Sequence, residues 1–144
     1  MLWKKLSPMQ LSINMSKNLL DTNLIIRFLV NDDPIKVSRV EKLLRNRNNT
    51  NILLDTVIAE IIWVLNSYYS LDKLEIIEKI RALIHVDTIE CNAVLINEAT
   101  RLWEENNISY IDAYLSAVAR LGNITLYTYD TKLKLIPGII IKEP

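Results

Sequence analysis

The sequence predicts an α/β fold in three layers, α/β/α, with a mainly parallel central sheet of about five strands. Two observations lead to this prediction. Short apolar segments alternate along the chain with longer segments that have the 3.6-residue period of amphipathic helices. The short segments are apolar on nearly all sides, which is typical of parallel strands covered by helices on both faces. No internal repeat or linker interrupts the pattern, so we expect one domain over residues 17–144, after an N-terminal extension of residues 1–16.

The strands are predicted from short apolar runs, several of which end in a polar or turn-forming residue. They are residues 18–20, 52–54, 86–89, 124–129 and 139–141. The second of these runs follows an Asn-rich segment, residues 46–51, which is expected to be a loop. The last run follows Pro137 and Gly138, a typical turn pair.

The helices are predicted from apolar residues that recur every three or four positions. They are residues 24–30, 36–45, 56–68, 70–85, 92–106 and 111–121. Asp55 and Asp72 are the expected N-caps of the third and fourth helices. Gly122 is the expected stop of the sixth helix, because glycine commonly ends helices.

The composition excludes several classes of protein. Half of the 144 residues are hydrophobic, too many for a disordered chain. Seventeen basic residues balance 17 acidic ones, so bulk charge indicates neither a nucleic-acid nor a membrane partner. The lone cysteine, Cys91, can form no internal disulfide, which fits a reducing compartment. The longest apolar run, residues 57–65, is broken by Glu60 and is far shorter than the roughly 20 residues that span a bilayer. We therefore expect a cytoplasmic protein without a membrane partner.

Four acidic residues stand alone within or at the end of apolar segments. They are Asp21, Glu60, Asp112 and Asp130. Acidic side chains are almost never fully buried without a partner, and comparable apolar segments hold too few cations to pair all four. Asp21 and Asp130 follow predicted strands, whose carboxyl ends form the ligand-binding edge of open α/β sheets. Asp112 falls in the first turn of a predicted helix, which can face the same edge.

A shared divalent cation would explain these four acids together. If they converge, their mutual repulsion raises pKa values and destabilises the fold, and a bound cation removes that conflict. Mg²⁺ prefers oxygen ligands, usually carboxylates, waters and substrate phosphate. Such a cation lowers the pKa of a water, orients it against phosphorus and shields the leaving oxygen. The pattern therefore indicates a site for phosphodiester hydrolysis.

Each acid also has a simpler interpretation. Asp21 and Asp112 could cap the helices that follow them, and taken singly this is the favoured interpretation. Asp130 could belong to an ordinary turn with Lys132. Glu60 could face solvent, although its apolar neighbours leave little polar surface. Four independent explanations are harder to sustain than one, so a metal site is the favoured hypothesis.

The motifs around these acids, in their order and spacing, resemble those of the PIN domain. They are LLDTN at residues 19–23, VIAEIIWVL at 57–65, DA at 112–113 and LYTYD at 126–130. The closest resemblance is to the VapC-type ribonuclease toxins of bacterial and archaeal toxin–antitoxin pairs, and RFLVNDDP at residues 27–34 is similar to one branch of them. The resemblance covers about residues 17–141.

This resemblance implies a parallel sheet between helices and an endoribonuclease dependent on Mg²⁺ or Mn²⁺, frequently a homodimer. It places the catalytic and metal-binding positions at Asp21, Glu60, Asp112 and Asp130. It also implies that Thr22, Asn23 and Thr128 orient the carboxylates or bind water. The expected partners are the RNA substrate and an antitoxin protein, which would lay an apolar helix into a groove between the N-terminal helices.

A basic segment follows the first acidic motif. It contains Lys36, Arg39, Lys42, Arg45 and Arg47. These side chains could steer RNA phosphates, although such a run is more often the solvated face of an amphipathic helix. Besides a toxin, two other functions fit the sequence: a nuclease of RNA processing or quality control, and a catalytically silent module that binds RNA or protein.

Overall fold

The computed structural model describes residues 16–144, so nearly all of the predicted N-terminal extension lies outside the described residues. The elements are β1 (Ser16–Leu19), α1 (Thr22–Val30), α2 (Pro34–Arg45), β2 (Asn49–Ile52), α3 (Asp55–Ser67), α4 (Lys73–Ile84), β3 (Ile89–Glu90), α5 (Ala93–Glu105), α6 (Tyr110–Gly122), β4 (Leu126–Tyr127), the 3₁₀ helix η2 (Leu133–Leu135) and β5 (Ile141–Lys142). Two compact units meet in the sequence between Cys91 and Asn92, and each is described by itself.

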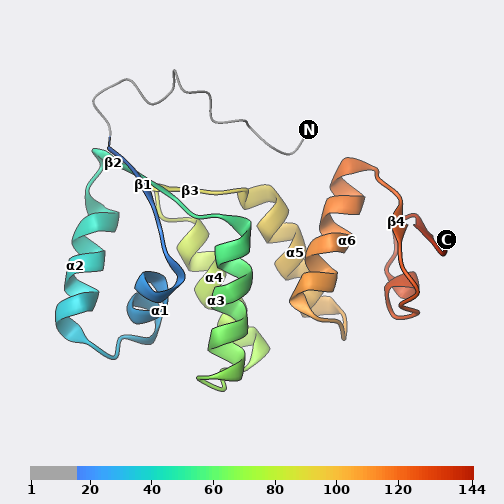
Figure 1. Ribbon diagram of the computed structural model, residues 1–144, viewed down its shortest axis with the longest axis horizontal. Coiled ribbons are helices and arrows are strands. Elements are labelled where there is room, and N and C mark those ends of the chain that lie inside the picture. Colours follow the sequence, from blue (N-terminus) through green and yellow to red (C-terminus); the bar gives the residue numbers. More distant parts are fainter. Residues whose placement is uncertain (1–15) are drawn as a thin grey trace. The chain divides into compact units, whose positions relative to one another are not determined.

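The first unit is built on a parallel sheet with the strand order β1-β2-β3 (Figure 1). Leu19 is in register with Ile52, and Ile52 in turn with Glu90. The ladder continues past the strand ends, since the Leu20 amide donates to the Ile52 carbonyl at 3.0 Å. This register brings the carboxyl ends of β1 and β2 to one edge, where α1 and α3 begin.

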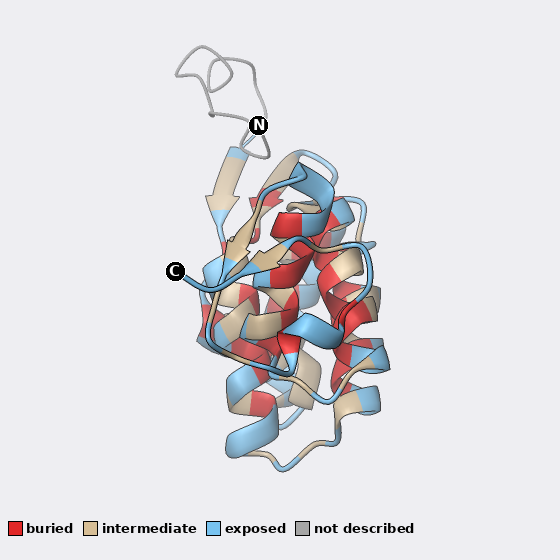
Figure 2. Ribbon diagram, turned by 90° about the vertical axis from the view of Figure 1, so that its right-hand side faces the viewer, coloured by how far each residue is buried: buried red, intermediate tan, exposed pale blue. Residues whose placement is uncertain are grey.

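The interior of this unit is made largely of isoleucine. Ile25, Ile58, Ile61, Ile76 and Ile80 are each 0% exposed, and they come from α1, α3 and α4. Buried and exposed positions alternate along these helices, as their sequence period predicts. Figure 2 shows the same alternation along the helices that face its viewer. The apolar area removed from water here is the main term that holds the helices against the sheet.

Polar side chains also cross the sheet, which corrects the predicted loop at residues 46–51. Asn49 to Asn51 belong to β2. Asn51 is 0% exposed; its amide oxygen accepts from Asn18 at 3.0 Å and its amide nitrogen donates to Thr88 at 3.1 Å. The Thr88 hydroxyl donates onward to the Leu44 carbonyl at 2.6 Å. An asparagine therefore fits a central strand because neighbours on both sides satisfy its amide group.

Helix caps in this unit follow the local sequence closely. Asp72 is the N-cap of α4, as predicted, and accepts from the Glu75 amide at 2.9 Å. Asp33 caps α2 in the same way, and Pro34 occupies the first turn, where its missing amide costs nothing. The predicted cap at Asp55 is wrong by one position, because Leu54 is the N-cap of α3 and Asp55 lies inside the first turn.

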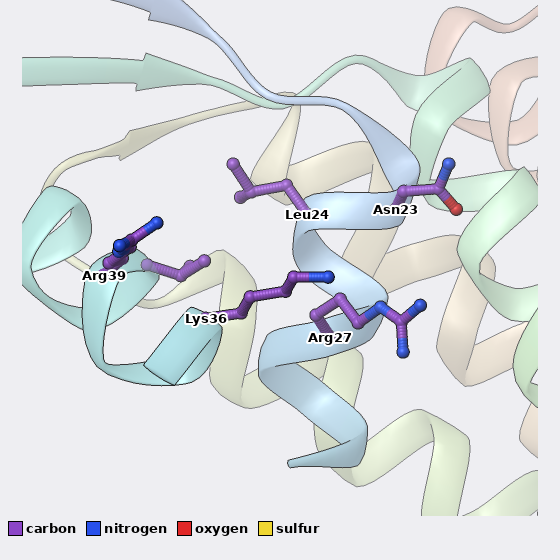
Figure 3. A pocket seen from close by; sticks show the side chains of 6 residues that line it. Asn23, Leu24, Arg27, Lys36 and Arg39 are labelled. Atoms are coloured by element: carbon purple, nitrogen blue, oxygen red, sulfur yellow. The ribbon is translucent and has the colours of Figure 1, made fainter. Parts of the chain in front are cut away.

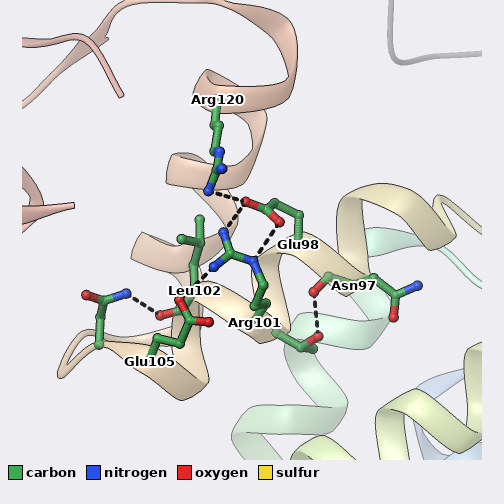
Figure 4. A network of polar contacts seen from close by, with 8 residues as sticks. Asn97, Glu98, Arg101, Leu102, Glu105 and Arg120 are labelled. Atoms are coloured by element: carbon green, nitrogen blue, oxygen red, sulfur yellow. Dashed lines mark hydrogen bonds and ion pairs between the residues drawn. The ribbon is translucent and has the colours of Figure 1, made fainter. Parts of the chain in front are cut away.

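The second unit joins α5 and α6 to a short parallel pair, β4 and β5, in which Leu126 is in register with Ile141. An ion-pair network ties the two helices together (Figure 4). Glu98 on α5 accepts from Arg101 at 2.7 and 3.0 Å and pairs with Arg120 on α6 at 3.0 Å. The hydrogen bond from Arg101 lowers the pKa of Glu98, with further contributions from Arg120.

Two boundaries of this unit differ from the prediction. Gly122 lies within α6, and Asn123 takes the left-handed conformation at φ 51°, so the helix stop is Asn123 rather than Gly122. Asparagine tolerates this conformation better than most residues. The last strands are also shorter than the apolar runs that predicted them, because only the residues with a strand partner count as strand. Within residues 16–144, every helix is too short or too polar to cross a membrane.

Candidate functional site

Asp21 lies where the β1 ladder gives way to α1. It occupies the N-cap position with extended backbone angles, φ −90° and ψ 152°, but its side chain makes no capping hydrogen bond. The carboxylate is exposed and has no hydrogen-bond or ion-pair partner among the described residues. The capping interpretation therefore does not account for this acid, and both of its oxygens remain available to a ligand.

Glu60 is held beside this point by the residue that follows Asp21. The Thr22 hydroxyl donates to Glu60 Oε2 at 2.7 Å and bridges the first residue of α1 to the second turn of α3. Thr22 is 5% exposed, whereas Glu60 is exposed. The structure thus bears out the solvent-facing alternative for Glu60, although its apolar neighbours in the sequence disfavour it. The other carboxylate oxygen of Glu60 has no partner among residues 16–144. Asp21, Thr22 and Glu60 share one edge of the first unit; we call them the first acidic pair with its threonine bridge.

Asn23, the remaining polar residue of the first motif, is exposed in the first turn of α1. It makes no side-chain hydrogen bond to either acid within the described residues. It instead borders a cavity between α1 and α2. Its expected role in orienting carboxylates stays a prediction.

In the second unit, Asp112 lies in the first turn of α6. The cap of this helix is Ser109, whose hydroxyl accepts from the Asp112 amide at 3.1 Å, so the alternative in which Asp112 caps its own helix is wrong. The Asp112 carboxylate has no hydrogen-bond partner in the described part of the chain.

Asp130 follows β4 and makes a local turn. Its amide donates to Thr128 Oγ1 at 3.0 Å, and its Oδ1 accepts from the Lys132 amide at 2.9 Å. The turn interpretation is therefore confirmed for this residue. The Thr128 hydroxyl contacts the backbone amide of Asp130 rather than its carboxylate. The other carboxylate oxygen of Asp130 has no partner among residues 16–144, so the turn does not exclude a ligand.

The charges around these four acids leave them without counter-ions. No ion pair among the described residues includes any of them. Arg27, the lone cation in the apolar segment after Asp21, pairs with Asp32 at 2.7 Å instead. Neither unit alone groups three acidic, His or Cys side chains that could hold a metal ion, within residues 16–144. Asp21 and Glu60 belong to one unit, and Asp112 and Asp130 to the other, so their convergence stays a prediction.

The donor set itself fits a hard divalent cation. Free carboxylate oxygens are the ligands that Mg²⁺ prefers, and it commonly binds through one or two carboxylates while keeping several waters. The first acidic pair provides such oxygens, with the threonine bridge fixing one of them. Cys91, by contrast, is unsuited to chemistry: burial, and next the charge of Asp55, raise the pKa of its thiol to about 11.

Comparison with known protein families assigns the chain to a family. The family model described as "PIN domain" matches residues 19–139, most of the chain. The chain belongs to the PIN domain family. The match spans all four acids and both elements that carry the threonine bridge. PIN domains are nucleases with a three-layer α/β/α fold, which confirms the predicted fold class. Within residues 16–144, the strands form one three-stranded and one two-stranded parallel sheet.

Among solved structures, the PIN domain is similar to a chain in the crystal structure of VapBC2 from Rickettsia felis bound to a DNA fragment from their promoter. The similarity covers 88% of this chain and 98% of the other, with 22% sequence identity and a TM-score of 0.39. No curated protein matches this chain closely enough to count as a relative.

The basic segment lies on and just after α2, where all five of its side chains are exposed. Lys36 pairs with Asp33 at 3.7 Å, and Arg47 with Asp87 at the same distance. Arg27, on α1, lies outside the basic segment and is not among its predicted RNA-binding residues. Its position four residues after Asn23, on the same face of α1, is the signal that could have added it.

Proposed function

We propose that this PIN domain is a divalent-metal-dependent endoribonuclease that hydrolyses RNA phosphodiester bonds and acts as the toxin of a toxin–antitoxin pair. The observation that carries the proposal is the state of the acids. Asp21, Asp112 and one oxygen of Glu60 have no partner among residues 16–144, although unpaired carboxylates are costly to bring together. Membership in a nuclease family supports the same conclusion.

Asp21, Glu60, Asp112 and Asp130 would hold Mg²⁺ or Mn²⁺. Bound there, the cation would supply the acidified water and the neutralisation of charge on phosphate that hydrolysis requires. The chain's own part is to position the oxygens. Thr22 holds one Glu60 oxygen and leaves the other without a partner among residues 16–144. The Lys132 amide likewise holds one oxygen of Asp130. Fixed ligands reduce the reorganisation needed when the substrate binds.

The toxin role is supported by the resemblance of the LLDTN and RFLVNDDP segments to VapC-type sequences. The proposed toxin role implies that the protein binds an antitoxin, forms a homodimer and acts in the cytoplasm. A toxin should arrest growth when it is expressed alone, and co-expression of the antitoxin should relieve the arrest. A nuclease of RNA processing would cleave RNA without such relief.

The direct test replaces one carboxylate in each unit. Asp21→Asn and Asp112→Asn should each reduce Mg²⁺-dependent cleavage of a single-stranded RNA by more than the roughly 10- to 100-fold typical of residues that only orient metal ligands. The amide keeps the size of the side chain and removes its charge, so circular dichroism should stay unchanged. Cleavage rates are measured with and without EDTA.

The matched control is Glu78→Gln, which changes an exposed glutamate on α4 that has no ion pair among the described residues and should cleave like the wild type. Unchanged cleavage by either active-site variant would refute the assignment. A wild-type protein that neither cleaves RNA nor binds a divalent cation in calorimetry would instead favour the catalytically silent module.

A further inference from the structure

We propose that the cavity between α1 and α2 binds a phosphate group of the RNA strand, beside the first acidic pair; this rests on the proposed ribonuclease function. The cavity has a volume of about 450 Å³. It is lined by Asn23, Leu24, Arg27, Lys36, Arg39 and Val40 (Figure 3).

The lining contains three cations and no carboxylate. Lys36 extends from α2 toward α1, where Arg27 lies (Figure 3). Arg27 uses only Nη1 for its pair with Asp32, so most of the five donors of its guanidinium are left. Lys36 is 3.7 Å from Asp33, too long for a strong hydrogen bond. Arg39 has no ion pair with any residue among 16–144. The cavity therefore offers several charged donors to an anion.

The remaining walls suit the rest of a nucleotide. Leu24 and Val40 give the cavity an apolar side, and Val40 is 6% exposed. The volume lies within the range of roughly 300–1,000 Å³ typical of small-molecule sites, which is larger than a lone phosphate needs. A ribose or base can lie against the apolar side while the phosphate faces the cations.

The position of the cavity connects it to the acids. Asn23 borders it and is only two residues after Asp21. Arg27 is six residues after Asp21, which corresponds to about 9 Å along the axis of α1. An RNA strand lying against Asp21 and Glu60 can thus reach the cavity with a neighbouring phosphate. The acids cannot attract a polyanion and the chain has no net charge, so local cations must supply the attraction.

An acidic peptide would use the same cations, and so would an acidic segment of the antitoxin, whose helix is expected in a groove between the N-terminal helices. RNA is favoured because α1 carries both cavity-lining residues and Asp21 at its start, so a strand bound at Asp21 has a neighbouring phosphate within reach of the cavity. The two occupants differ in their response to the same variants.

The test measures binding of a short, fluorescently labelled single-stranded RNA by anisotropy, in EDTA so that no cleavage occurs. Arg39→Gln and Lys36→Gln should each weaken the affinity about tenfold, as expected for loss of a charge-assisted contact. The slope of log affinity against log salt should fall by about 0.7 for each lost phosphate contact. The comparison variant is Lys42→Gln, which removes another exposed cation of the basic segment that does not line the cavity. If the cavity rather than the whole basic segment holds the phosphate, this variant should change affinity less than about twofold.

Equal losses in Arg39→Gln and Lys42→Gln would overturn the proposal, because they would indicate a diffuse basic helix face. So would an Arg39→Gln variant that binds RNA normally but no longer binds a poly-glutamate peptide. If Arg39→Gln loses RNA binding while the wild type shows no metal-dependent cleavage, the cavity is supported and the nuclease proposal fails. Normal cleavage with unaffected RNA binding in Arg39→Gln refutes the cavity alone.

Discussion

Thr22 is the residue through which two distant acidic motifs come into contact. Its hydroxyl is buried and donates to Glu60, 38 positions later in the chain. The Thr22 hydroxyl does not cap α1, because Asp21 rather than Thr22 occupies the N-cap position. Its contribution is therefore to the geometry of the site rather than to the stability of the helix.

Replacing this hydroxyl should weaken function more than folding. Thr22→Val keeps the branched shape but removes the donor, so we expect a roughly 10- to 100-fold loss in cleavage rate or metal affinity. Thr22→Ser keeps a donor and should retain most activity. The rate and the half-saturating Mg²⁺ concentration are measured for both, with circular dichroism as the folding control. Equal activity in Thr22→Val and the wild type would exclude a positioning role.

At the scale of elements, the polar chain through β1, β2 and β3 sets the identity of the central strand. Asn51 donates and accepts at once, to Thr88 and from Asn18. Apolar residues could fill this space, but only a residue with both hydrogen-bonding groups satisfies its two neighbours. We infer that the chain helps to select one strand register, because a slip of one residue would move Asn51 to the opposite face.

Removal of Asn51 should be costly. Asn51→Ala removes the acceptor of the Asn18 amide nitrogen and the donor to the buried Thr88 hydroxyl, so we expect a loss of about 1–3 kcal/mol in the free energy of unfolding. Asn48→Ala, at an exposed position just before β2, should change it by less than about 0.5 kcal/mol. Urea denaturation followed by circular dichroism measures both. Similar values for the two variants would show that the buried amide is not needed.

The pairing of α5 with α6 should depend on pH. The pKa of Glu98 is lower in the folded protein than its ordinary value of 4.5, because Arg101 and Arg120 stabilise the carboxylate. Its stabilising contribution is therefore complete above pH 4.5 and is lost as pH falls through the folded pKa. Glu98→Gln should cost about 1 kcal/mol at neutral pH, and the difference from the wild type should shrink in acid.

The control for this effect is Glu78→Gln, which changes an exposed glutamate on α4 that has no ion pair among the described residues. Its unfolding free energy should match that of the wild type at every pH. A Glu98→Gln penalty that stayed constant down to pH 3 would show that the hydrogen bonds, rather than the charge, hold the two helices.

At the scale of the whole molecule, the essential question is whether both units supply ligands to one cation. A ligand that binds only the folded state raises its stability, by about 2.7 kcal/mol at 100 times the dissociation constant. Mg²⁺ or Mn²⁺ should therefore raise the thermal midpoint of the wild type. The rise should vanish in both Asp21→Asn and Asp112→Asn, although these residues lie in different units. A rise lost in only one of them would place the cation within a single unit.

The helix boundaries could be predicted from the sequence to within a few residues, because an amphipathic period repeats over several turns and every turn adds evidence for the same helix. Prediction was less accurate for strands. Asn49 to Asn51 look like a loop, and residues 124–129 look like a longer strand than β4, since a strand exists only where a neighbour pairs with it. Arg27 was likewise overlooked, because its place beside the cavity depends on how α2 folds back along α1.

The amino-acid sequence by itself determined the alternation of helices and strands, the family and the positions of the four acids, because period and motif spacing are properties of neighbouring residues. Only the tertiary structure decided that Thr22 contacts Glu60, that Ser109 rather than Asp112 caps α6, and that Arg27, Lys36 and Arg39 line one cavity. The sequence around these residues does not distinguish them from other polar residues that could make the same contacts. Which residues meet is therefore decided by the packing of the elements and by the need of each buried polar group for a hydrogen-bond partner.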